Sequence, residues 1–158
     1  MSIKDNLGVE TDELFVLKTK WIKETTKKTI EIHDFLKKIE DDKKGIQSPK
    51  FKLAGVEFAI DVYPNNIVNG SPDYIGVFLF NYSGEDQTIS MTVKEASGLE
   101  NLDLEMDIVE TGRGWGFHQF LTHEKYRAWA KDNGDVFKLR AEVTVHTKVD
   151  TAEDGWTR

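Results

Sequence analysis

The stretch Tyr74-Ile-Gly-Val-Phe-Leu-Phe-Asn-Tyr82 decides the fold class, because an extended chain with this sequence is apolar on both faces. Aliphatic residues would point to one side of the strand and aromatic residues to the other: Ile75, Val77 and Leu79 against Tyr74, Phe78, Phe80 and Tyr82. Such a strand either lies in the centre of a sheet or carries an aromatic binding face. The sequence leaves both interpretations open.

Strand patterns continue on both sides of this stretch. Three segments alternate apolar and polar residues with a period of two, as half-buried strands do: 56–62, 102–108 and 137–145. Shorter strand candidates are 29–35, 50–53, 88–93 and 115–121. Residues 122–134 predict one short helix, with Thr122 as its N-cap and Gly134 as its C-terminal stop. Several short strands with one helix, and no alternation of strand and helix, predict an all-β antiparallel sandwich.

The composition is typical of one globular domain: 158 residues, of which 39% are hydrophobic and 31% charged. The chain has no cysteine, so disulfides, cysteine-ligated metals and thiol nucleophiles are excluded. Its 21 basic and 28 acidic residues give a net charge of -7, which argues against binding to nucleic acid or to an anionic membrane. The sequence shows neither a signal-peptide pattern nor an apolar run of roughly 18 residues. We therefore expect a cytoplasmic or nuclear protein.

No catalytic or metal-binding pattern stands out. The four histidines form no His-Glu-x-x-His motif, and His118 and His123 have no further ligand at suitable spacing. The glycine-rich stretch 112–116 lacks the Gly-Lys-Ser/Thr of a phosphate-binding loop. Carboxylates are too numerous for any pair to be singled out as acid and base. We expect no enzyme activity and no cofactor.

The predicted domain spans residues 27–149, with an extension over 1–26 and a tail over 150–158. In the extension, Leu7, Leu14 and Trp21 are spaced by seven and Leu17 falls at a d-type position, as in a coiled coil. The repeat is too short to favour an oligomerising helix over an edge strand or an ordinary extension. We expect a monomer for this chain in isolation, and allow for an oligomer within a longer parent protein.

An aromatic pair distinguishes the segment 112–120. Trp115 and Phe117 would project to the same side of a strand, and Gly114 and Gly116 leave the backbone beside them unshielded. Aromatic residues at this spacing lie in the core more often than in a binding site. Both interpretations are kept.

Five stretches between Lys27 and Val149 occur in an order known from one family: Ser48-Pro-Lys-Phe51, Phe58-Ala-Ile-Asp-Val-Tyr-Pro64, Asp73-Tyr-Ile-Gly-Val-Phe-Leu79, Gly112-Arg-Gly-Trp-Gly-Phe-His-Gln-Phe120 and Asp135-Val-Phe-Lys-Leu-Arg-Ala-Glu-Val143. Through them the chain resembles the MATH domains (meprin and TRAF-C homology). The Trp-Gly-Phe-x-x-Phe core is the most specific element. The resemblance implies a TRAF-C-like sandwich of eight antiparallel strands that recognises short peptide segments of partner proteins and does no chemistry.

In relatives, the peptide adds as a strand beside the one holding this core, here Arg113 to His118. The resemblance implies peptide-binding residues at Tyr74, Ile89, Arg113, Gly114, Trp115, Gly116 and Phe117. Family groove aromatics also fall near Ile89 and Asp107, which are not aromatic here. The chain would then be an adaptor, or a substrate-recognition domain of the kind that serves ubiquitin ligases. The alternatives are a trimeric TRAF-like assembly domain with a degenerate groove and, less favoured, a small-ligand carrier or hydrolase.

Gly114 and Arg113 affect which residues a bound peptide is expected to carry. Gly114 stands where relatives often have an acidic residue that bonds a serine of the ligand, so the resemblance gives no reason to expect a serine requirement. Arg113 offers a planar fork of donors suited to a carboxylate. We expect a preference for an acidic residue near the centre of a bound peptide.

Overall fold

A computed structural model describes residues 12–41 and 44–152. Within these ranges the chain forms the following elements: β1 (Leu17–His33), α1 (Phe35–Asp41), β2 (Ile46–Gln47), β3 (Phe51–Leu53), β4 (Val56–Tyr63), the 3-10 turn η1 (Ile67–Asn69), β5 (Tyr74–Asn81), β6 (Gln87–Glu95), β7 (Asn101–Val109), β8 (Gly114–Thr122), α2 (His123–Asn133) and β9 (Val136–Ala152). The all-β prediction is confirmed, with nine strands in the described residues where eight were expected and with one more short α-helix.

The chain divides into a larger unit, Lys23–His146, and a smaller unit formed by the segments before and after it. In the smaller unit, described over residues 12–22 and 147–152, the Thr19 hydroxyl donates to Asp150 Oδ1 at 2.7 Å. Leu17 and Trp21 lie in strand β1. A coiled-coil seam is therefore absent at these two positions, whereas Leu7 lies outside the described residues.

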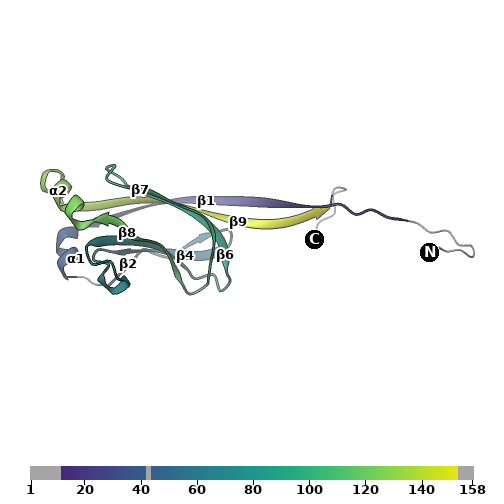
Figure 1. Cartoon of the computed structure of the whole chain (residues 1–158), viewed down its shortest axis with the longest axis horizontal. Helices are drawn as coiled ribbons and strands as arrows, with labels where there is room; N and C mark the ends of the chain where they lie inside the picture. The colour runs from purple at the N-terminus through teal and green to yellow at the C-terminus, as the bar shows by residue number, and fades with distance from the viewer. Residues whose placement is uncertain (1–11, 42–43, 153–158) are drawn as a thin grey trace, which may run out of the picture. The chain divides into compact units, whose positions relative to one another are not determined.

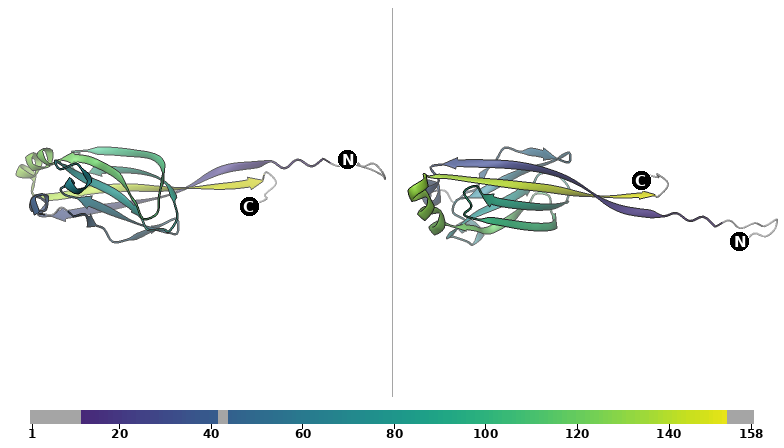
Figure 2. Two further views of the ribbon diagram at one scale, coloured as in Figure 1. Left: turned by 60° about the horizontal axis from the view of Figure 1, so that its bottom comes forward. Right: turned by 90° about the horizontal axis from the view of Figure 1, so that it is seen from above.

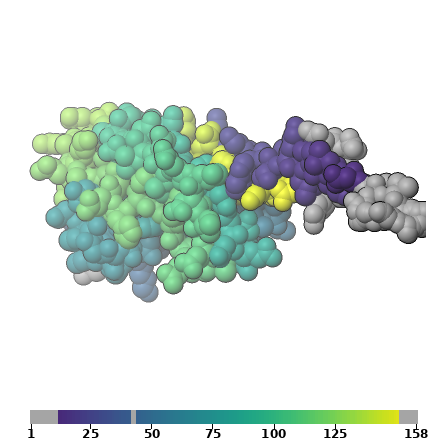
Figure 3. Space-filling view, turned by 45° about the vertical axis from the view of Figure 1, so that its right-hand side comes forward, coloured from purple at the N-terminus to yellow at the C-terminus, as the bar shows by residue number. Residues whose placement is uncertain are grey.

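The larger unit consists of two antiparallel sheets packed face to face, with α1 and α2 at one end (Figure 1, Figure 2). One sheet has the strand order β1-β9-β6-β7, and the other has the order β2-β4-β5-β8, with β3 also paired to β4. Strand β5 lies between β4 and β8, so it is central in its sheet. Figure 3 shows one face of this unit, on which teal and green residues from the middle of the chain reach the surface.

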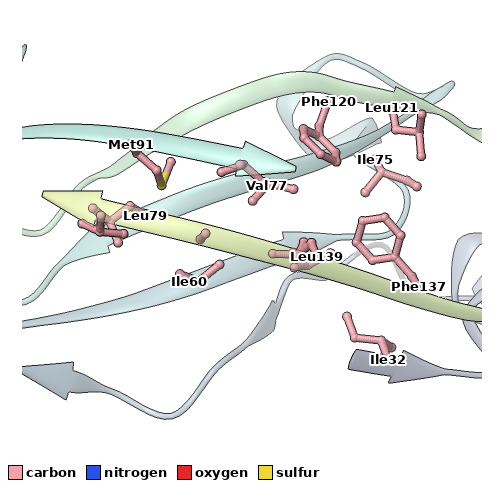
Figure 4. Packing of buried hydrophobic residues seen from close by; sticks show 14 of the residues in the cluster. Ile32, Ile60, Ile75, Val77, Leu79, Met91, Phe120, Leu121, Phe137 and Leu139 are labelled. Atoms are coloured by element: carbon pink, nitrogen blue, oxygen red, sulfur yellow. The ribbon is translucent and has the colours of Figure 1, made fainter. Parts of the chain in front are cut away.

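Alternating side chains from both sheets fill the space between them (Figure 4). Ile75, Val77 and Leu79 of β5 are fully buried there, as are Phe137 and Leu139 of β9. The aliphatic face of β5 therefore points inward, and its aromatic face points away from the core. The central position of the stretch 74–82 is confirmed, and its aromatic residues form an outward face whose role in binding stays a prediction.

Helix α1 replaces the end of a predicted strand. The expected strand 29–35 ends at His33, since Asp34 has a φ of 54° and turns the chain. Phe35 and Ile39 then bury themselves one helical turn apart. The Asp135 carboxylate accepts hydrogen bonds from the Leu36 amide at 3.0 and 3.1 Å and so holds the start of the helix. Seven residues are too few for a helical period to be visible in the sequence.

Helix α2 and its predicted ends are confirmed. The Thr122 hydroxyl accepts a hydrogen bond from the Lys125 amide at 3.2 Å, and Gly134 lies at the C-cap. The helix follows β8 directly, so it fixes the end of that strand. No helix in the described part of the chain is long and apolar enough to cross a membrane.

Strand β7 departs from its predicted alternation. Leu102 and Leu104 are half-buried, but Met106 and Ile108 are 51% and 64% exposed. The pairing of β6 with β7 shifts register between Ile89 and Met91. This irregularity turns the second half of β7 over, because a one-residue slip moves every later side chain to the other face.

Candidate functional site

Strand β8 forms one edge of its sheet, because it is the last strand in the order β2-β4-β5-β8. It pairs antiparallel with β5 in this register: Val77 with Phe117, Phe78 with Gly116, Leu79 with Trp115 and Phe80 with Gly114. The other side of β8 has no strand partner in the described part of the chain. Its main-chain groups on that side are free to pair with another extended segment.

The remaining sheet edges are protected, and β8 is not. Strands β2 and β3 are only two and three residues long, β1 carries lysines along its length, and β7 carries Asp103, Glu105 and Asp107. Short length and charged side chains are common ways in which proteins block edge pairing. The sequence of β8, Gly-Trp-Gly-Phe-His-Gln-Phe-Leu-Thr, has neither proline nor a carboxylate, lysine or arginine. Strand addition is therefore least hindered at β8.

Trp115 and Phe117 lie on the inner face of β8. Their register partners Leu79 and Val77 are fully buried, and cross-strand partners share a face. Both aromatic residues are half-buried and pack against the core, and the rings of Phe117 and Phe120 are 6.2 Å apart. Of the two interpretations of this pair, packing on the core is what the structure shows directly.

The two glycines of β8 point to the outer face and have different surroundings. A Cβ atom on Gly116 would overlap the carbonyl oxygen of Val77 and lie 2.7 Å from the Cα of Phe78. A Cβ atom on Gly114 would lie 3.7 Å from the Cβ of Phe78 and 3.9 Å from Cδ2 of Phe80, which is ordinary contact. Gly116 therefore allows β8 to approach β5 closely, whereas position 114 has room for a small side chain in ordinary contact with Phe78 and Phe80.

A hollow of about 200 Å³ occupies this outer face. Residues of β4, β5, β8 and η1 line it: Asp61, Tyr63, Asn69, Phe78, Phe80, Gly114 and His118. The Phe78 ring meets the Tyr63 and His118 rings nearly edge-on, at centroid distances of 5.7 and 4.9 Å. The walls of the hollow are thus mainly aromatic.

Asp61 supplies the carboxylate of this hollow. Its Oδ1 atom accepts a hydrogen bond from the Gln47 amide at 2.8 Å, and Gln47 also donates to the Tyr82 hydroxyl at 2.9 Å. Burial raises the pKa of Asp61, and the bond from Gln47 opposes this change by favouring the ionised form. Burial therefore removes part of the water around the carboxylate, and the hydrogen bond from Gln47 makes up for only part of that loss.

Asn66 connects this face to the irregular part of β8. The pairing of β5 with β8 shifts register between Ile75 and Val77. Nearby, the fully buried Asn66 side chain donates to the His118 carbonyl oxygen at 2.8 Å and accepts from Asn69 at 2.7 Å. These bonds fix His118 and Asn69 at the rim of the hollow.

The other residues predicted for the site lie apart from the hollow. Tyr74 pairs with Thr122, at the far end of β8 from Gly114. Ile89 is fully buried in the other sheet, so it offers no surface to a ligand. The Arg113 side chain is largely exposed, with Nε at 3.9 Å from Glu110 Oε1, and does not line the hollow. The expectation of an acidic ligand residue, which rested on Arg113, gains no support from this arrangement.

The sequence reasoning missed the residues that line the hollow. The aromatic face of the stretch 74–82 was the one available signal, since Phe78 and Phe80 belong to it. Asp61 and Tyr63 come from β4 and His118 from β8, so only the register brings them together. Within the described residues, no group of three or more His, Asp or Glu side chains could hold a metal ion.

Comparisons with known proteins agree with this architecture. The family model described as MATH domain matches residues 27–143, which is more than half of the chain. Among solved structures, the fold is similar to Notothenia coriiceps TRAF5, with a TM-score of 0.55 and 19% sequence identity, over 74% of this chain and 72% of that chain. The search of curated proteins gave no match. The chain therefore belongs to the MATH domain family, a family of protein-interaction modules.

Proposed function

We propose that this chain binds an extended segment of a partner protein by adding it as a strand to the free edge of β8. The observation that carries the proposal is the combination of an unblocked edge at β8 with an aromatic hollow beside it. In this mode of recognition, main-chain hydrogen bonds supply affinity and pockets for alternate side chains supply specificity. Membership of a family of protein-interaction modules supports the same conclusion.

Each part of β8 has a role in this proposal. An added strand places alternate side chains on the outer face, where Gly114 and Gly116 have no side chains to obstruct them. Trp115 and Phe117 hold β8 against the core from the inner face. The ligand therefore meets a strand whose position is fixed before binding, which reduces the entropy lost on binding.

The test uses a peptide selected against the full chain from a random linear display library. Single N-methyl groups are placed on successive peptide amides, and each affinity is measured by calorimetry. Alternate amides of a strand point to opposite sides. We expect methylation at one set of alternate positions to weaken binding by about 2–10-fold per lost hydrogen bond, and methylation at the other set to have little effect.

Backbone amide NMR shifts locate the bound peptide. The largest changes are expected in β8 and around the hollow. A Met106→Lys variant serves as the control, since Met106 is exposed on β7 in the other sheet, and it should bind the peptide as the wild type does. Strand addition at β8 is refuted if N-methylation shows no alternation, or if the shifts concentrate on the β1-β9-β6-β7 sheet.

A further inference from the structure

We infer that the outer face of the β1-β9-β6-β7 sheet binds a phosphate monoester group, presented by a phosphorylated residue of a partner protein. The site is a recess of about 410 Å³ formed by β1, β9 and β6, which we call the basic recess. Its lining includes Lys27, Thr29, Thr92, Lys94, Arg140 and Glu142. It belongs to the other sheet from β8, so the inference goes beyond the proposed function.

Two cations of the basic recess lie directly opposite each other. Lys94 of β6 and Arg140 of β9 are register partners. The preceding pair in the register, Val93 with Ala141, is fully buried, so Lys94 and Arg140 point to the outer face. Directly opposite side chains have Cβ atoms about 4.5–5.5 Å apart, and like charges at such positions destabilise a sheet. An anion bound between the two cations would relieve this repulsion.

Neither cation has a counter-ion within the described residues. Both side chains are exposed, and no hydrogen bond or ion pair joins either of them to another part of the described chain. On its other side Lys94 pairs with Asn101 of β7, which is uncharged. The hydroxyl of Thr29, which also lines the recess, likewise has no hydrogen-bond partner among the described residues. These three side chains are therefore available as donors to a ligand.

The carboxylates that flank the recess along its strands cannot take this role, because each is already engaged. Their contacts are Glu142 Oε2 with Lys27 Nζ at 3.5 Å, Asp103 Oδ1 with the Thr92 hydroxyl at 2.7 Å, Glu31 Oε2 with Lys138 Nζ at 3.2 Å, and Glu100 Oε1 with the Asn101 amide at 3.0 Å. Of the charged side chains that line the recess, three are basic and one is acidic. The recess is therefore locally positive in a chain whose net charge is -7.

A phosphate monoester suits this arrangement better than a carboxylate does. It carries about 1.5–2 negative charges at pH 7 and three strong acceptor oxygens. Its oxygens can accept from the planar fork of Arg140 and from the ammonium of Lys94 at the same time. The Thr29 hydroxyl offers a further donor. A carboxylate, with one negative charge, would neutralise only one of the two opposed cations.

The surroundings of the recess favour a phosphate carried by a partner protein. Sites that enclose small molecules are mostly apolar and bury most of the ligand. Here the walls are charged, and the Lys27 side chain is 80% exposed. The net charge of -7 opposes the long-range attraction of a free anion. A phosphate on a segment that makes further contacts overcomes this disadvantage, because those contacts raise its effective concentration at the recess.

The first experiment tests the phosphate group alone. The probes are the N-acetyl, N′-methylamide derivatives of phosphoserine, serine and glutamate, titrated into the labelled full chain at constant ionic strength and followed by NMR. The phosphoserine probe should shift the signals of Thr92, Lys94 and Arg140. The serine probe should leave them unchanged, and the glutamate probe should shift them less. Serine is the matched control, since it lacks only the phosphate.

The second experiment tests the partner segment and the two opposed cations. Peptides with a fixed central phosphoserine and random flanking residues are selected against the full chain. Removing the phosphate from the selected peptide should lower its affinity at least about tenfold. Lys94→Gln and Arg140→Gln should each lower the affinity of the phosphorylated form at least about fivefold. Lys125→Gln removes the same charge from an exposed position on α2 and should bind as the wild type does.

Thermal melts supply a readout that a purely structural role would not give. Without ligand, the Lys94→Gln and Arg140→Gln variants should melt at or above the wild-type Tm, since each removes one of two like charges. The phosphoserine peptide should raise the Tm of the wild type more than that of either variant. Both variants should still bind an unphosphorylated peptide at β8, so the outcome is separate from that of the proposed function.

Three results would overturn the inference. The first is that the shifts caused by the phosphoserine probe fall outside the recess or do not occur. The second is an equal loss of affinity in Lys125→Gln, which would indicate a general effect of charge. The third is that inorganic phosphate binds as tightly as the selected phosphopeptide, which would assign the recess to free phosphate and not to a partner protein.

Discussion

Substitution of the two glycines of β8 by alanine should give opposite results. An added methyl group on Gly116 overlaps the Val77 carbonyl oxygen and lies 2.7 Å from the Phe78 Cα. These atoms belong to the main chain of β5, so no rotation of a side chain relieves the overlap. On Gly114 the nearest atoms are side-chain atoms at 3.7 and 3.9 Å, where a methyl group fits.

The expected magnitudes follow from these distances. Overpacking typically costs 1–3 kcal/mol, and a clash with main chain belongs at the upper end, so we expect Gly116→Ala to lose about 3 kcal/mol. For a chain of this length, that loss lowers Tm by about 6–12 °C. Gly114→Ala should melt within about 2 °C of the wild type, since alanine in place of a strand glycine also removes a conformational-entropy cost.

Differential scanning calorimetry at one scan rate and one protein concentration measures both variants. A Gly114→Ser variant is a second check on the permissive position. If Gly116→Ala melts within about 2 °C of the wild type, or if both alanine variants fall equally, the close approach of β8 to β5 in this register is wrong.

Three further predictions concern the helix cap, the aromatic pair and the carboxylate of the hollow. Thr122→Ala removes the bond to the Lys125 amide and should lower the free energy of unfolding in urea by about 1 kcal/mol, with Thr122→Ser restoring most of it; no loss would mean that the cap contributes nothing. Trp115→Ala should lower the free energy of unfolding by less than the roughly 3–5 kcal/mol expected for Phe120→Ala, which removes a fully buried ring. It should weaken capture of the selected peptide at least about tenfold, a loss of the size seen at hot spots. A loss of stability as large as that of Phe120→Ala, with unchanged peptide affinity, would exclude Trp115 from the site. Asp61→Asn should be at least as stable as the wild type at neutral pH, because burial raises the pKa of Asp61 above its value in the unfolded chain. The folded protein therefore binds the proton of this carboxyl more tightly than the unfolded chain does. As pH falls through the raised pKa, the wild type should gain stability relative to the variant. Melts of both proteins across an acid-to-neutral pH series check the sign, and an Asp61→Asn variant that is clearly less stable at neutral pH contradicts it.

Local patterns in the sequence predict the strands well, because burial on one face leaves a period of two. The stretches around Phe58 and Leu139 show this directly, and both residues are fully buried. The helix cap at Thr122 was predictable for a similar reason, since capping depends on a few adjacent residues. The five stretches that resemble MATH domains also predict how these strands follow one another in a TRAF-C-like sandwich.

Features that depend on pairing between strands were not predictable from local patterns. The register shift opposite Ile89 exposes Met106 and Ile108, although their sequence alternates as a buried strand would. Helix α1 depends on Asp135, a residue about a hundred positions away along the chain. The hollow joins Asp61, Phe78 and His118 from three strands. Each of these requires the register, which a single sequence does not reveal.

Charge placement directs an incoming strand to the edge of β8. Lysines on β1 and carboxylates on β7 discourage pairing at the other long edges, so an incoming strand is directed to β8. The chain's net charge of -7 attracts basic segments over longer distances and repels acidic ones. Long-range attraction therefore speeds the encounter with a basic segment and edge protection selects the docking position, and added salt should slow this encounter.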